Sequence, residues 1–172
     1  RITTHLAKID NQKFKATSTS RINLSESYDE LVNNYTFNTK SEIDNLNHDD
    51  FSFSAMEKPE VFLAQEKLTL PEKNILFRLF YNAIQRGTGI CIKVINTNKN
   101  TSAFAFFISD AGKIYTVYTG RQNDTQAELL LFDTFLKNNS AKPVSLHSSI
   151  ANHQIISKFG GIKSELVQYE MI

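Results

Sequence analysis

The stretch that decides the fold, residues 90–119, reads ICIKVINTNKNTSAFAFFISDAGKIYTVYT. Three runs rich in β-branched and aromatic residues, at 90–95, 102–109 and 113–119, are separated by short segments rich in Asn, Asp and Gly. We therefore expect three consecutive strands joined by hairpin turns. Residues 103–108 are apolar on both faces, which predicts a central strand covered on both sides.

A helix is predicted on each side of these strands. Before them, Thr69 and Glu72 have the spacing of a capping box, and Gly87 follows the last turn. After them, residues 125–138 carry apolar side chains on more than one stripe, so we expect this helix to be well buried. In the first helix, apolar residues recur at helical spacing and predict its packing face: Ile75, Leu76, Leu79, Phe80, Ala83 and Ile84.

The amino-terminal segment predicts four further elements. Polar and apolar residues alternate over residues 13–24, as in an edge strand. Ser27 and Glu30 repeat the capping-box spacing and predict a short helix. A second short helix is expected at 38–45. Residues 51–54 alternate as in a strand with one buried face.

The carboxyl-terminal segment completes the order of elements. A short strand is predicted at 143–147, a short helix at 151–159 and a last strand at 165–172. Gly160 and Gly161 end that helix. From residue 70 onward the chain therefore predicts an α/β (α+β) unit.

The composition fits one globular domain. The 172 residues are 41% hydrophobic and 22% charged, an ordinary globular mix. A net charge of +1 argues against strong attraction to nucleic acid or membranes, and no apolar run approaches the ~20 residues that span a bilayer. Cys91 is the single cysteine, so no internal disulfide can form, and we expect it as a small buried residue in a strand. With no visible signal peptide, a cytoplasmic location is expected.

Four short segments follow one another in this order: Ser27–Leu31 (SYDEL), Ala127–Asp133 (AELLLFD), Lys158–Gly161 (KFGG) and Tyr169–Glu170. Together with the order of helices and strands, they resemble the GNAT superfamily of N-acetyltransferases. The resemblance is greatest to the branch shared with the FemAB-type aminoacyl transferases of bacteria, and it covers roughly residues 21–172. It implies a GNAT-like central sheet, mixed but mostly antiparallel, flanked by helices.

The resemblance also implies a domain organisation. Residues 25–172 would form one GNAT-like domain, and residues 1–24 would be a trailing strand or segment from a preceding GNAT-like half. FemAB-type proteins usually pair two such domains, and this chain resembles the second. A second GNAT-like half, or a second copy of the chain, is therefore an expected partner.

The loop between the third strand and the buried helix, residues 120–125 (GRQNDT), is the expected donor site. Free N–H groups at a helix N-terminus bind anions, and Arg121 can add a phosphate contact. The resemblance places acetyl-CoA or another CoA thioester here. The residues expected to bind it are Thr119, Gly120, Arg121, Gln122, Asn123, Asp124, Thr125 and, at the start of the short helix, Asn152. The alternatives are a simple turn capped by Asp124, and an N-cap role for Asn152.

Three side chains are candidates for proton transfer: His147 at the end of a strand, His153 in the following short helix, and Tyr118 near the end of the third strand. The histidines could act as base and acid at the open end of the sheet, and the tyrosine could line a substrate groove. Surface, capping or packing roles are the alternatives. No spacing typical of a metal site is present, so no metal is expected.

The resemblance implies an N-acyltransferase that moves an acyl or aminoacyl group from a CoA thioester or an aminoacyl donor to an amine. The acceptor would be a small molecule or a peptide. Many family members carry more glycines in the donor loop, and a tyrosine about three residues before the closing glycine. The departures of this sequence from that pattern favour an alternative, a non-catalytic GNAT-like module for binding or interaction.

Overall fold

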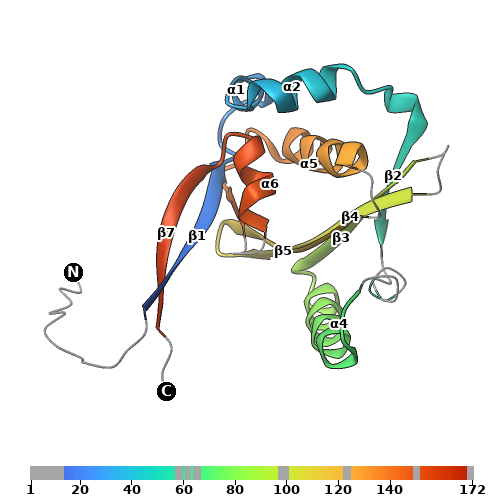
Figure 1. The fold of residues 1–172 in the computed structure, drawn as a ribbon, viewed down its shortest axis with the longest axis vertical. Coiled ribbons are helices and arrows are strands. Elements are labelled where there is room, and N and C mark those ends of the chain that lie inside the picture. The colour runs from blue at the N-terminus through green and yellow to red at the C-terminus, as the bar shows by residue number, and fades with distance from the viewer. Residues whose placement is uncertain are drawn as a thin grey trace, which may run out of the picture.

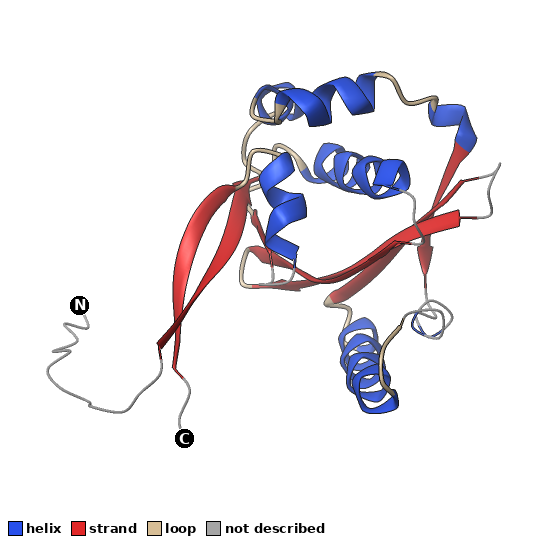
Figure 2. Cartoon of the chain, viewed as in Figure 1, coloured by secondary structure: helices blue, strands red, loops and turns tan. Residues whose placement is uncertain are grey.

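The computed structural model describes residues 14–56, 60, 63, 67–96, 101–121, 125–148 and 152–169. They form a seven-stranded sheet with helices on both faces (Figure 1, Figure 2). In chain order the elements are β1 (Phe14–Asn23), α1 (Tyr28–Asn33), α2 (Phe37–Asp44), the 3₁₀ turn η1 (His48–Asp50), β2 (Phe51–Met56), α4 (Leu70–Gln85), β3 (Gly89–Asn96), β4 (Thr101–Asp110), β5 (Lys113–Arg121), α5 (Thr125–Asn139), β6 (Ser145–Ser148), α6 (His153–Lys158) and β7 (Ile162–Tyr169).

The strands lie in the order β2-β3-β4-β5-β6-β1-β7. Neighbouring strands are antiparallel except β5 and β6, which run parallel from the pair Lys113↔Ser145 to the pair Thr116↔Ser148. α5 forms the crossover connection that a parallel pair requires. The sheet is therefore mixed and mostly antiparallel, as predicted.

Two apolar clusters lie on opposite faces of the sheet. The larger packs α1, α2, α5 and α6 against one face, and its members include Phe107 of β4 and Phe132 of α5. The smaller packs α4 against the other face, around Phe80, Phe104 and Phe106. Figure 1 shows α5 between the sheet and the layer of α1 and α2, with α4 on the far side. Alternate residues of β4 serve the two clusters, which confirms the predicted central strand.

Both predicted capping boxes are present. The Ser27 N–H donates to Glu30 Oε2 at 2.8 Å, and the Thr69 N–H donates to Glu72 Oε2 at 2.8 Å. Each carboxylate thus accepts an N–H at a helix start that would otherwise lack a partner in the helix. α1 and α4 begin directly after these caps.

One strand lies in a different place from the prediction. The alternation over residues 13–24 predicted an edge strand, but β1 lies between β6 and β7. It pairs with β7 from Phe14↔Tyr169 to Arg21↔Ile162, and its last three residues also pair with β6. Alternation indicates one buried face. Whether β1 has one or two neighbouring strands depends instead on the position of β7 in the sheet, and the sequence around residues 13–24 carries no information about that position.

The predicted packing face of α4 is only partly buried. Phe80 and Ala83 are buried, whereas Ile75 and Leu79 are 67% and 39% exposed. α4 packs mainly on β3, and the apolar side chains on either side of that contact stay exposed. Helical spacing thus predicted the helix correctly and overestimated the width of its buried face.

Candidate functional site

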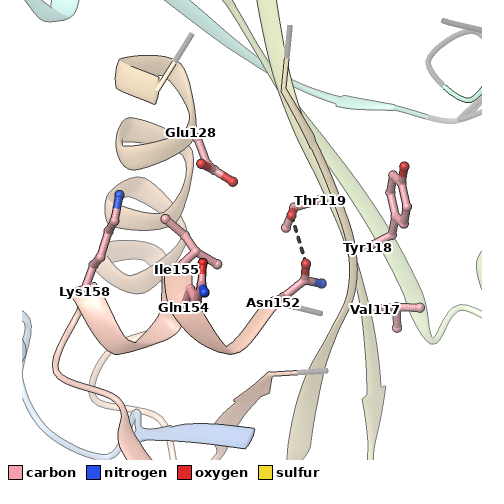
Figure 3. Close-up of a pocket in the computed structure, with 8 residues that line it drawn as sticks. All are labelled: Val117, Tyr118, Thr119, Glu128, Asn152, Gln154, Ile155 and Lys158. Atoms are coloured by element: carbon pink, nitrogen blue, oxygen red, sulfur yellow. Dashed lines mark hydrogen bonds between the residues drawn. The ribbon is translucent and has the colours of Figure 1, made fainter. Parts of the chain in front are cut away.

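The candidate site lies where two neighbouring strands separate. β5 and β6 pair in parallel only as far as Thr116↔Ser148. β6 ends there, whereas β5 continues to Arg121 with β4 as its partner on the other side. From Val117 onward, this edge of β5 therefore faces the start of α6 instead of another described strand (Figure 3).

A bulge interrupts β5 at the same point. Phe107 pairs with Thr116, but the preceding residue, Phe106, pairs with Tyr118. Val117 is therefore an extra residue in β5, and the alternation of side chains reverses beyond it. Strands commonly carry such bulges where a side chain must be re-aimed next to a site.

Because of the bulge, Thr116 and Thr119 both lie on the face covered by α5 and α6. Thr119 Oγ1 donates to Asn152 Oδ1 at 3.0 Å, and Asn152 Nδ2 makes a longer contact of 3.5 Å with the Thr116 carbonyl (Figure 3). The buried Asn152 side chain thus takes the place that a strand would have beside β5. Thr116 Oγ1 is buried and has no hydrogen-bond partner within the described part of the chain.

A cavity of about 370 Å³ lies beside this contact. Two charged side chains line it: Glu128 in the first turn of α5, which is 9% exposed, and Lys158 at the end of α6, which is half-buried. The other described lining residues are Val117, Tyr118, Thr119, Asn152, Gln154 and Ile155. The cavity thus brings together a carboxylate, an ammonium, a hydroxyl and amides, which suit the binding of a polar ligand and proton transfer.

Two of the predicted donor-binding residues, Thr119 and Asn152, line this cavity. Three more are described and lie next to it along the chain: Gly120, Arg121 and Thr125. Gly120 is buried in β5, and the exposed Thr125 begins α5. The remaining three lie outside the described residues: Gln122, Asn123 and Asp124.

Tyr118 is a lining residue of the cavity, but its ring lies on the opposite face of the sheet and points away from Asn152 and Glu128 (Figure 3). Its ring centroid lies 5.7 Å from that of Phe104 and 6.3 Å from that of Phe80. These rings belong to the apolar cluster beneath α4. Tyr118 therefore connects the cavity with the core on the opposite face of the sheet.

The two histidines lie on opposite faces of the sheet, so the structure does not bring them together. His147 lies beside Tyr115, with ring centroids 5.4 Å apart, on the face away from α6. The next residue, Ser148, faces α6 and accepts a hydrogen bond from the Ser20 N–H. His153 lies in the first turn of α6. Neither histidine is among the described residues that line the cavity.

Three polar lining residues were not predicted: Glu128, Gln154 and Lys158. Gln154 and Lys158 are four residues apart on α6, so they lie on one face of that helix. This spacing is present in the sequence, but only the position of α6 beside β5 shows that it faces a cavity. Glu128 stands among apolar residues of a buried helix, and an acid in such a pattern is the signal that could have identified it.

Other kinds of site are not found within the described ranges. No group of three or more His, Cys, Asp or Glu side chains there could hold a metal ion. Among the helices of those ranges, none has the length and apolar character needed to cross a membrane. Cys91 is buried in β3, as predicted, and burial raises the pKa of its thiol to about 12. The thiol is therefore protonated at neutral pH and is a poor nucleophile.

No protein-family model matches this sequence, and no curated protein matches it by sequence. Solved structures do match the fold. FemX superimposes with a TM-score of 0.67 and 9% identity, over 87% of this chain and 61% of that chain. A conserved protein of unknown function from Bacteroides thetaiotaomicron VPI-5482 gives 0.64 and 10%, over 93% and 62%. A functionally unknown conserved protein from Staphylococcus epidermidis ATCC 12228 gives 0.55 and 6%, over 91% and 61%.

The chain spans about three fifths of the length of each of these proteins. At identities of 6–10%, the matches show a common fold. The mixed α/β fold with its mostly antiparallel sheet is thus shared with FemX, in agreement with the fold that the sequence resemblance implies.

Proposed function

We propose that this chain is an N-acyltransferase of the GNAT/FemAB type, which moves an acyl or aminoacyl group from a CoA thioester or an aminoacyl donor to an amine. The observation that carries the proposal is the cavity where β5 separates from β6, bridged by the hydrogen bond between Thr119 and Asn152. The sequence resemblance and the fold shared with FemX support the same class.

The edge of β5 beyond Thr116 is the proposed seat of the donor. The pairing of β5 with β6 ends at Thr116, so a ligand could lie alongside this edge and accept a hydrogen bond from its backbone. A donor carbonyl aligned there would accept such a bond, and the bond would strengthen as negative charge develops on the oxygen during attack. Phosphates of the donor would then lie near the N-terminus of α5, where the helix dipole favours anions.

Glu128 is the proposed base for the acceptor. An amine reaches the site as an ammonium ion and must lose a proton before its nitrogen can attack. A buried carboxylate on the cavity wall would attract that cation and accept the proton. The amine nitrogen then forms a bond to the carbonyl carbon, and the carbon–sulfur bond of a thioester, or the carbon–oxygen bond of an aminoacyl ester, breaks. The proton that Glu128 accepted would then pass to the departing sulfur or oxygen atom.

Lys158 defines the class of acceptor. Lys158 is half-buried at the end of α6, on the wall that also carries Gln154. A small molecule or a peptide that bears a carboxylate near its amine could bind to both charged walls at once. Positioning of the two reactants in this way contributes much of the rate enhancement expected of a transferase.

Binding is tested first, through the melting temperature measured with acetyl-CoA, with free CoA and with an aminoacyl-tRNA. A specific ligand raises the melting temperature by mass action. Asn152→Ala removes both contacts to β5, so it should abolish the shift. Asn82→Ala, on the exposed surface of α4, is the matched control and should keep it. If no donor raises the melting temperature, or Asn152→Ala responds like wild type, the proposal fails.

Transfer is tested second, by following loss of the donor in the presence of a series of amines. Glu128→Gln preserves the shape of the side chain and removes the base, so it should lower the rate at least about tenfold while the melting-temperature shift remains. Donor binding without transfer to any amine would instead favour the alternative, a GNAT-like binding module.

A further inference from the structure

A second polar surface lies where β7, β1, β6 and β5 run side by side, on the face of the sheet away from α6. Residue pairing places four side chains in one row across these strands: Ile162, Arg21, His147 and Tyr115. Two residues along, a second row on the same face holds three more: Asn23, Ser145 and Lys113. Paired residues have Cβ atoms roughly 5 Å apart, so these seven side chains form one surface, the basic sheet face.

The basic sheet face is open. α4 packs mainly on β3, several strands away, and Figure 1 shows β1 and β7 extending away from it. Arg21 and Lys113 are exposed, and Tyr115 is 36% exposed. A cavity of about 340 Å³ lies on this face, lined by Arg21, Asn23, Glu26, Ser145 and Ile162.

Positive charge is concentrated at the centre of this face. His147 lies between Arg21 on β1 and Lys113 and Tyr115 on β5. Burial lowers the pKa of His147, and the charges of Lys113 and then Arg21 lower it further. Ser145 Oγ and His147 Nε2 share a hydrogen bond of 2.8 Å, which adds a hydroxyl to the group.

Glu26 is the acid at the rim of the cavity. Its Oε2 accepts from Asn34 Nδ2 at 3.3 Å, so the carboxylate is held toward α1. The arrangement therefore has a cationic centre, an aromatic ring on one side and carboxylates at its edges, since Asp110 of β4 pairs with Lys113 on the same face. A bound anion would relieve the repulsion among the cations, and the carboxylate could accept from hydroxyl groups.

We propose that the basic sheet face binds a nucleoside phosphate, with the phosphate between Arg21, Lys113 and the Ser145 hydroxyl and the base stacked on Tyr115. Arginine forms paired, charge-assisted hydrogen bonds with phosphate oxygens. Aromatic side chains on an open sheet stack on bases, and the identity of the base has little effect on that stacking. Glu26 accepts from the sugar hydroxyls. The net charge of the chain is only +1, so this local arrangement, and not a general positive field, provides the attraction. The proposal does not rest on the acyl-transfer function.

The test is a titration followed through the imidazole NMR signals of His147, which are assigned with His147→Gln. The ligands are AMP, adenosine, inorganic phosphate and a short single-stranded RNA. AMP should shift the His147 signals and raise the His147 pKa, because the bound anion stabilises the imidazolium. Adenosine and phosphate, which each lack one half of the ligand, should bind at least about tenfold more weakly. Binding of adenosine as tight as that of AMP, or unchanged His147 signals, overturns the proposal.

Two sources of the nucleotide are then distinguished. Tighter binding of the RNA, with an affinity that falls steeply as salt rises, would identify a nucleic-acid strand as the ligand. Binding of AMP at least as tight as the RNA would identify a free nucleotide. Either result supports the shared chemistry, and weak binding of both overturns it.

Variants locate the site. Arg21→Gln combined with Lys113→Gln should raise the His147 pKa in the free protein and weaken AMP binding at least about tenfold. The matched control is Arg86→Gln combined with Lys40→Gln, which removes the same charges from exposed positions directly after α4 and within α2 and should bind AMP normally. Tyr115→Leu should reduce AMP affinity to that of inorganic phosphate. If the first pair fails to fold, Lys113→Gln alone gives the same comparison. If both double variants lose the same amount of AMP affinity, the basic sheet face is not the binding site.

Discussion

α5 and α4 are two apolar helices of similar length that pack on opposite faces of one sheet, yet they are buried to very different degrees (Figure 2). Nine of the 15 residues of α5 are buried, whereas two of the 16 residues of α4 are. α5 lies between the sheet and the layer of α1 and α2, so it has neighbours on more than one side. α4 packs mainly on β3 and keeps several large apolar side chains exposed: Leu70, Ile75, Phe77, Leu79 and Tyr81.

This difference explains where the cavity lies. α5 is fixed by packing on several sides, so its first turn can hold Glu128 in a nearly buried position beside Thr119. A rigid element positions a functional side chain better than a mobile one does. On the face covered by α4, the described residues form no comparable polar cavity. α4 covers the apolar side chains of β3 and β4 there.

The largest expected difference between the two helices concerns one pair of leucines. Leu136 of α5 is 0% exposed and Leu79 of α4 is 39% exposed. Leu136→Ala should lower the free energy of unfolding by about 2–5 kcal/mol, because it removes buried contacts and leaves a cavity. Leu79→Ala should lower it by at most about 1 kcal/mol. Urea unfolding of both variants at one protein concentration measures the two losses.

Equal losses for the two leucines would contradict this view of α4. They would mean that another surface covers Leu79 in solution. In that case the loss for Leu79→Ala would depend on protein concentration, because binding of a second copy stabilises the folded state by mass action.

A smaller effect is expected at the polar contact that joins α5 to the layer above it. Asp133 is 4% exposed and accepts from the Tyr28 hydroxyl at 2.7 Å and from the Tyr35 hydroxyl at 3.0 Å. Burial, and then the neighbouring carboxylate, raise the pKa of both phenols, so both remain donors at neutral pH. Asp133→Ala leaves a buried donor without this acceptor and should cost about 1–3 kcal/mol in urea unfolding.

Two variants control for this loss. Asp133→Asn keeps an oxygen acceptor and should cost less than Asp133→Ala. Asp44→Ala removes an exposed carboxylate at the end of α2 and should leave the free energy of unfolding nearly unchanged. A loss for Asp133→Ala no greater than that for Asp44→Ala would show that the contact contributes nothing to stability.

Local signals predicted the elements well. The capping boxes at Ser27 and Thr69 and the apolar run at 103–108 gave the starts of two helices and the central strand, because each depends on residues close together in the chain. The burial of α4 could not be predicted in the same way. Its apolar spacing resembles that of a well-covered helix, and only the layers around it decide which side chains are covered.

The site was predictable in part for a related reason. Thr119 and Asn152 came from the resemblance, but the bulge at Val117 that turns Thr116 and Thr119 toward Asn152 has no clear signal in the sequence. Regular alternation would place Thr116 and Thr119 on opposite faces of β5. Glu128 could not be identified from the sequence pattern, because the apolar residues around it indicate a buried core helix.

The smallest effects are expected at the capping boxes, which begin α1 on one face of the sheet and α4 on the other. Hydrogen bonds from Ser27 lower the pKa of Glu30 beside α1, and those from Thr69 lower the pKa of Glu72 beside α4. A lowered pKa in the folded state means that the carboxylate contributes stability above its unfolded pKa, near 4.3. That contribution is lost as the pH falls through the lower folded value.

Ser27→Ala and Thr69→Ala should therefore each lower the free energy of unfolding by about 1 kcal/mol at pH 7. Each difference from wild type should shrink below about pH 4, as the carboxylate partner becomes protonated in both states. Urea unfolding at a series of pH values measures this. The two losses should be similar, because a cap acts on its own first turn and not on the face that the helix covers. A full loss for Ser27→Ala with none for Thr69→Ala would mean that the start of α4 unfolds locally before the rest of the molecule, as its exposed flanks would permit.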